Sequence, residues 1–118
     1  MKKTLFIGFI MTLALFGCDL FNSEHNPKDT TVAGAKNQRD GTYVRISGQI
    51  TSEITHEWYT FSDHTGIINI EIENEVWGRS GVNPNSLTFP LQVEIIGEVD
   101  KERAQQTTIE VESIKILY

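Results

Sequence analysis

Few side chains in this sequence have the types and spacings that chemistry requires. His25 precedes all the expected strands. His56 and His64 are expected at opposite ends of a strand of about six residues, which separates them by about 20 Å at ~3.3 Å per residue. No serine or cysteine nucleophile has a paired base in a recognisable motif. The chain also has no Cys-x-x-Cys or His-x-x-x-His spacing and no Gly-rich phosphate loop. We therefore expect no catalytic residue, no metal site and no cofactor.

The single cysteine, Cys18, has a different chemical context. Two lysines near the N-terminus precede an apolar run at residues 5–16 and then the small residue Gly17, an order typical of a secretory signal. The run is shorter than the ~20 residues that a membrane-spanning helix needs. Residues 15–18 (Leu-Phe-Gly-Cys) resemble the lipobox of bacterial lipoproteins, in which the cysteine thiol receives diacylglycerol and cleavage precedes it. An ordinary secretory signal, which would leave Cys18 as a free thiol, is the alternative.

The lipobox resemblance implies a protein anchored by lipid at the periplasmic side of the cell envelope, with the bilayer as its first partner. Residues 1–17 would be the signal peptide, and residues 18–30 the acylated cysteine and a flexible polar tether. Residues 31–118 would then form a single domain. Asp19 resembles the inner-membrane retention signal of enteric lipoproteins, while sorting to the outer membrane stays open.

The charge balance restricts the possible partners. Loss of residues 1–17 removes two lysines and no acid, which takes the net charge from −6 to −8. An acidic surface repels phosphate backbones and attracts cations, so we expect no nucleic-acid partner. A chain with one cysteine forms no internal disulfide, so the domain depends on a hydrophobic core.

The elements that position any site are expected to be mostly strands. A short helix should begin after Thr30 or Thr31 as N-cap and end by Gly41. From residue 42 apolar and polar residues alternate, which is typical of strands packed on one face. The five expected strands occupy residues 42–52, 58–62, 67–73, 90–99 and 107–117. A tight turn is expected at residues 63–66, an irregular connection at 74–89, and a β-bulge near Ser113.

The alternation also predicts the core. Tyr59 and Phe61 should point inward, and Trp77 should pack over one end of the barrel. The other inward positions are Val44, Ile46, Ile50, Ile68, Ile70, Ile72, Leu91, Val93, Ile95, Val99, Ile109, Val111, Ile114 and Ile116.

These strands predict an all-β fold, a five-stranded OB-fold Greek-key barrel with a short N-terminal helix. The hairpin at residues 61–68 looks like one found in many OB-folds. The order and spacing of several segments are similar to the bacterial OB-fold (BOF) family, namely Thr31 to Ala33, Ala35 with Lys36, Arg39 with Asp40, Gly48, Tyr59 to Asp63, Trp77 with Gly78, and Gly97 to Lys101. The resemblance implies a small exported protein associated with envelope stress tolerance. The stretch at residues 84–93 is longer than its counterpart in that family, so its loop is expected to differ in shape.

The outer face of the second and third strands is where OB-folds bind single-stranded nucleic acids, through aromatic and basic side chains. Here that face carries acids where phosphate contacts need cations, so a cationic ligand or peptide would suit it better. A tryptophan at its edge would add a cation–π contact of ~0.5–2 kcal/mol. The candidate ligand-binding residues are Trp58, Thr60, Asn69, Glu71, Glu73 and Arg45.

Further outward acids extend this surface. Glu94, Glu98, Glu110 and Glu112 lie on the fourth and fifth strands. Since the third, fifth and fourth strands are adjacent in an OB-fold, these acids would join the candidate face in one anionic wall. The function expected is a non-catalytic, lipid-anchored binding module of the envelope, active in stress tolerance.

Two other interpretations stay open. Acids that alternate with Ile and Val are also the ordinary way to solvate one face of a sheet and to prevent edge-to-edge aggregation. Alternatively, the domain is an interaction module that docks on an envelope protein or a cell-wall component. The connection at residues 74–89, with Val82, Leu87 and Phe89 expected to be exposed, would then be the docking surface.

Overall fold

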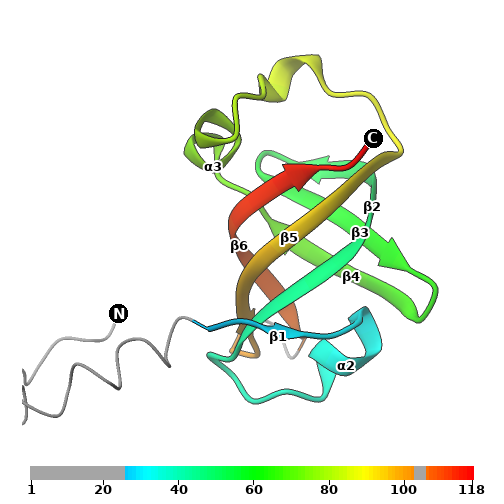
Figure 1. The fold of residues 1–118 in the computed structure, drawn as a ribbon, viewed down its shortest axis with the longest axis vertical. Coiled ribbons are helices and arrows are strands. Elements are labelled where there is room, and N and C mark those ends of the chain that lie inside the picture. Colours follow the sequence, from blue (N-terminus) through cyan, green and yellow to red (C-terminus); the bar gives the residue numbers. More distant parts are fainter. Residues whose placement is uncertain (1–25, 103–105) are drawn as a thin grey trace, which may run out of the picture.

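A computed structural model describes residues 26–102 and 106–118, which form a closed β-barrel with short helices at its two ends (Figure 1). Cys18, Asp19 and the expected signal peptide lie outside these residues. The strands are β1 (Lys28–Asp29), β2 (Tyr43–Thr55), β3 (Trp58–Asp63), β4 (Gly66–Glu71), β5 (Leu91–Asp100) and β6 (Thr108–Ile116). The helices are α2 (Val32–Lys36), α3 (Asn74–Arg79) and the 3₁₀ helix η2 (Pro84–Ser86). In the described part of the chain, no helix has the length and apolar character to cross a membrane.

The strand order β1-β2-β3-β4-β6-β5, closed by a β2–β5 pairing, is that of an OB-fold. All pairings between the five main strands are antiparallel except the parallel pairing of β4 with β6. The expected all-β OB-fold is therefore confirmed, with one difference in strand number. The added strand is β1, whose two residues pair in parallel with Val44 and Arg45 at the end of the expected tether.

The core follows the alternation of the sequence. Tyr59, Phe61 and Trp77 are all at most 2% exposed, as expected. Of the other inward positions, Leu91 and Ile116 are only half-buried, and the rest are buried. The bulge expected near Ser113 is also confirmed, because Ile96 pairs with Ser113 and Gly97 with Val111, which leaves Glu112 as the extra residue.

The N-terminal helix is held by the turn between β3 and β4. Thr31 is its N-cap and accepts a hydrogen bond from the backbone N–H of Gly34. The Asp63 carboxylate accepts from the N–H of Val32 at 2.9 Å, and the Thr65 hydroxyl accepts from the next N–H. The first N–H groups of α2 are thus satisfied by side chains, which compensates for its shortness.

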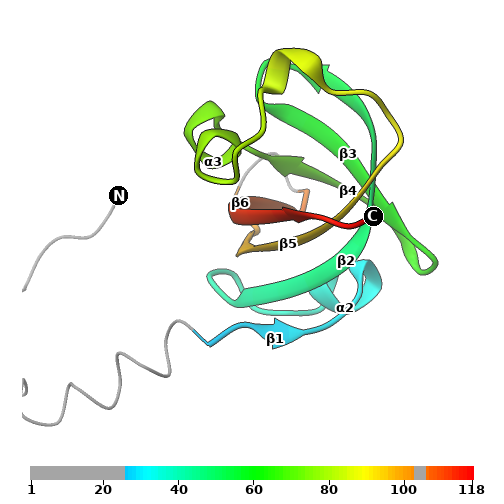
Figure 2. The same ribbon diagram turned by 45° about the horizontal axis from the view of Figure 1, so that its top comes forward.

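The connection between β4 and β5 is more regular than expected. It contains α3 and η2, which stand at the opposite end of the barrel from α2 (Figures 1 and 2). The Trp77 indole N–H donates to the Tyr59 hydroxyl at 3.2 Å inside the core. The prediction of an exposed apolar loop here is wrong, because Val82, Leu87 and Phe89 are partly buried and pack against the core.

Candidate functional site

Four of the six candidate ligand-binding residues meet on the outer face of β3 and β4. Trp58 pairs directly with Glu71, and Thr60 pairs with Asn69. Side chains of directly opposed residues lie ~4.5–5.5 Å apart at Cβ, so these two pairs form one patch. All four residues are half-buried. The structure thus brings an aromatic ring and a carboxylate together, as a cation–π and ion-pair site would need.

The other two candidates lie apart from this patch. Glu73 follows the end of β4 as the residue before α3, because the N–H of Ile72 turns to the carbonyl of Glu57 at 2.8 Å. Arg45 lies on β2 between β1 and β5, where its guanidinium forms an ion pair with Asp29 at 2.8 Å. The structure therefore brings four of the six candidate residues together and places Glu73 and Arg45 apart from them.

The patch continues into a row of acids across the barrel. Glu71 of β4 pairs with Glu110 of β6, and Glu110 pairs with Glu98 of β5. Glu98 in turn pairs with Tyr43 of β2. The expected order of the strands is confirmed, and it places these three carboxylates in one line around the outer surface. We call this line, together with Trp58 and Tyr43 at its ends, the acidic row.

Within the acidic row, the surroundings of Glu98 disfavour its negative charge. Burial raises the pKa of Glu98 above its ordinary value of 4.5, and the charges of Glu110, Glu112, Asp40 and Asp100 raise it further. A bound cation would stabilise the ionised form of Glu98. The row is therefore electrostatically complementary to a positive ligand.

Tyr43 was not singled out from the sequence, although the alternation places it on the outer face two residues before Arg45. Its hydroxyl donates to the Glu112 carboxylate at 2.9 Å. Burial, this hydrogen bond and the charges of nearby glutamates raise the pKa of Tyr43 to about 12. The phenol therefore stays protonated at neutral pH and holds the carboxylate of the bulged residue beside the acidic row.

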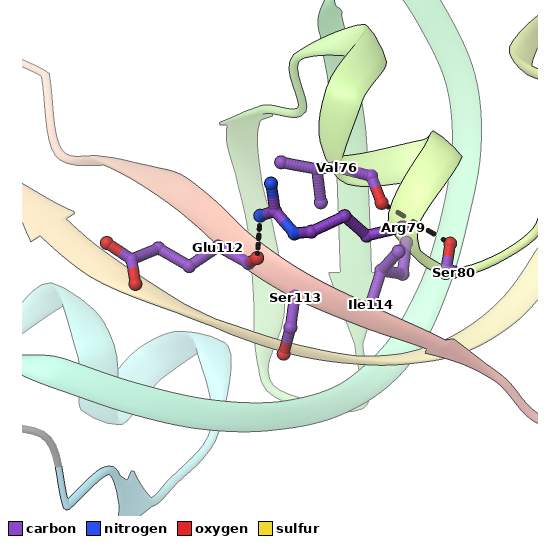
Figure 3. Close-up of a pocket in the computed structure, with 6 residues that line it drawn as sticks. All are labelled: Val76, Arg79, Ser80, Glu112, Ser113 and Ile114. Carbon is purple, nitrogen blue, oxygen red and sulfur yellow. Dashed lines mark hydrogen bonds between the residues drawn. The ribbon is translucent and has the colours of Figure 1, made fainter.

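Arg79 is the second residue that sequence reasoning missed. Its guanidinium donates to the main-chain carbonyl of Glu112 at 2.8 Å, beside a pocket of about 100 Å³ between α3 and β6 (Figure 3). Figure 3 also shows the Glu112 carboxylate pointing away from the guanidinium. The bulge frees this carbonyl from regular pairing, so Arg79 satisfies it and ties α3 to the strand that carries the acidic row.

Within residues 26–102 and 106–118, no three His, Cys, Asp or Glu side chains come together in a way that could hold a metal ion. A shallow hollow of about 440 Å³ lies over the middle of β2, between β3 and β5. Its lining is formed by Ser47, Gly48, Gln49, Ser62, Asp63, His64 and Gln92.

Comparison with known proteins agrees with this geometry. Residues 19–116 match the family model described as bacterial OB fold (BOF) protein. Protein YgiW of Escherichia coli K12 is 40% identical over 77 residues, which are 65% of this chain and 55% of YgiW. The calcium-regulated OB-fold protein CarO of Pseudomonas aeruginosa is 31% identical over 91 residues, or 77% of this chain and 73% of CarO.

A solved structure supports the same relationship. The E. coli ygiW structure has a TM-score of 0.63 and 37% identity, and the match covers 76% of this chain and 90% of that chain. The present chain thus spans little more than half of the curated YgiW sequence but nearly all of its solved part. Sequence, topology and structural similarity agree, and the chain belongs to the bacterial OB-fold (BOF) family.

Proposed function

We propose that this protein is a non-catalytic binding module of the bacterial cell envelope that captures cationic ligands, above all basic peptides. The observation that carries the proposal is the acidic row, in which paired strands align Glu71, Glu110 and Glu98 beside Trp58. A lysine or arginine of the ligand would gain ion pairs along the row and a cation–π contact at its end.

The distribution of charge along the chain supports the same ligand class. Residues 46–73 contain no lysine or arginine, whereas they hold five acids, Glu53, Glu57, Asp63, Glu71 and Glu73. This segment supplies β3, β4 and the hairpin between β2 and β3. The face on which other OB-folds hold nucleic acid is thus anionic, which favours a basic peptide and disfavours a phosphate backbone.

The proposal includes anchoring by lipid at Cys18 on the periplasmic side of the membrane. The support is the lipobox-like sequence before Cys18, with Asp19 favouring the inner membrane over the outer membrane. A module held there would intercept basic peptides before they reach the bilayer, which suits a role in envelope stress tolerance. The alternative docking module has less support, since Val82, Leu87 and Phe89 are packed against the core.

The ligand class is tested by titrating the mature protein with a cationic antimicrobial peptide and following amide shifts by NMR. Shifts should concentrate at Trp58, Asn69, Glu71 and Glu110, and high salt should suppress them. The double variant Glu71→Gln/Glu110→Gln should bind more weakly by about 1 kcal/mol, or roughly fivefold. Glu75→Gln, an exposed acid on α3, is the matched control and should bind as the wild type does. Binding that is insensitive to salt and to both variants would refute the proposal.

The anchor is tested separately by mass spectrometry of the protein isolated from membranes. We expect an acylated N-terminal cysteine in the wild type and a protein released from membranes in Cys18→Ser. An unmodified Cys18 in the wild type would show that the ordinary-signal alternative is right.

A further inference from the structure

One stretch of the barrel has an open strand edge. β5 pairs with β2 from Tyr43 to Ile50, where it begins at Leu91. β2 continues to Thr55, and beyond Ile50 the described residues pair with it only through β3. We call residues 51–55 the hairpin edge. A strand paired on one side only presents main-chain N–H and C=O groups that a further strand can use.

The hairpin edge is accessible. All five of its residues are exposed, and Ile54 is 52% exposed, which makes it one of the few large apolar side chains on the surface of the described barrel. The hairpin tip is nevertheless held in place. Glu57 has a positive φ of 68°, and its carboxylate accepts from the N–H of Asn74 at 3.0 Å. The edge is therefore presented on a fixed support.

The charges and the shape of the hairpin edge disfavour pairing with a second copy. Glu53 lies within it and Glu57 at the tip, so an antiparallel pair of these edges would bring like charges together. Two register shifts, between Ile50 and Ser52 and between Glu53 and Thr55, also twist the edge, as in natural edges that avoid aggregation. A short, positively charged strand would not be repelled by these glutamates, and it would not require a long flat edge to pair with.

We propose that an extended basic peptide binds by adding a strand to the hairpin edge. This inference rests on the proposed capture of cationic ligands. It adds a second contact surface and a mode of binding, next to the end of the acidic row where Thr55 pairs with Trp58. Main-chain hydrogen bonds to residues 51–55 would supply affinity that does not depend on peptide sequence. Lysine or arginine side chains would lie near Glu53 and Glu57, and an apolar residue would cover Ile54.

The test uses the mature protein in non-ionic detergent and a short peptide that alternates lysine and valine. Hydrogen–deuterium exchange is measured with and without peptide. Strand addition should slow exchange over residues 51–55 roughly tenfold, because open N–H groups become hydrogen-bonded. The same peptide with N-methyl groups on every second residue keeps its charges but loses donors, and its affinity should fall roughly tenfold.

The outcomes separate this inference from the proposed function. Binding that is salt-sensitive but leaves residues 51–55 unprotected, or that tolerates N-methylation, would overturn strand addition and leave capture on the acidic row standing. Absence of any binding would overturn both. Glu53→Gln should weaken binding two- to threefold at low salt, with Glu75→Gln again as the control. Protection of the edge by self-association without peptide would show that a second copy is the occupant, and would also overturn the inference.

Discussion

At the scale of single residues, Asp63 joins parts of the chain that are far apart in sequence. Its two carboxylate oxygens accept hydrogen bonds from the N–H of Val32 and from the N–H and hydroxyl of Thr65, at 2.9, 2.7 and 2.6 Å. Asp63→Ala should therefore free the start of α2 and lower the free energy of unfolding by about 1–3 kcal/mol. Urea unfolding measures this change. His64→Ala, an exposed neighbour in the same turn, should change it by less than about 0.5 kcal/mol.

The contribution of Asp63 should depend on pH. Burial alone raises its pKa, but hydrogen bonds from the Thr65 hydroxyl and from the N–H groups of Val32, Thr65 and Gly66 outweigh burial and lower it below 3.8. The folded state therefore favours the carboxylate. Its stabilising effect is complete above the unfolded pKa and is lost as pH falls through the folded pKa. An equal effect of Asp63→Ala at neutral pH and well below pH 3.8 would contradict this account.

At the scale of elements, two glycines make a matched pair. A Cβ at Gly48 would collide with the Ser62 carbonyl oxygen and with the Phe61 ring at 2.8 Å, because β2 bends against β3 there. A Cβ at Gly78 in α3 would meet nothing within 4 Å. Gly48→Ala should therefore destabilise the protein by about 1–3 kcal/mol, whereas Gly78→Ala should stabilise it by up to about 1 kcal/mol. Thermal unfolding of both variants tests this. A similar change of the same sign in both would show that the bend does not require glycine.

Hydrophobic periodicity determines how much of the fold could be predicted from the sequence. A strand with one buried face has apolar residues at every second position. Ile68, Ile70 and Ile72 therefore identify their strand and its inward side. α3 leaves no such signal, because it has six residues, contains Gly78 and has no side-chain cap. It forms because Val76 and Trp77 bury themselves over the barrel end, which is a tertiary effect. β1 is too short for any period to show.

The candidate site was predictable to the extent that it depends on alternation and strand order. Trp58 and Glu71 point outward on neighbouring strands, and the register of a tight hairpin then places them opposite each other. Glu73 shares that phase, but β4 ends at Glu71, and periodicity does not locate strand ends. Arg45 is set apart by its ion pair with Asp29 on β1, an element that the sequence does not reveal.

At the scale of the whole molecule, the excess of negative charge opposes folding. The sequence holds 16 acids against 10 basic residues. Part of this excess is concentrated in the acidic row, where Glu98 faces Glu110 directly across β5 and β6. Like charges in direct opposition destabilise a sheet. A row that only solvated the barrel would not need this arrangement, whereas a surface for cations recovers the cost when its ligand binds.

This arrangement predicts that mild acid stabilises the protein. Burial and neighbouring carboxylates raise the pKa of Glu98 above 4.5, so the folded state binds a proton more tightly than the unfolded state does. The free energy of unfolding should therefore rise as pH falls from neutral towards about 4.5, before protonation of Asp63 lowers it again. Glu98→Gln should raise stability at pH 7 by a few tenths to about 1 kcal/mol and have less effect at about pH 4.5. Glu75→Gln is the control for loss of one charge. If both variants give equal gains at both pH values, net charge alone explains the effect. If only Glu98→Gln shows the pH dependence, the charge repulsion is local to the acidic row, and a bound cationic ligand would relieve it.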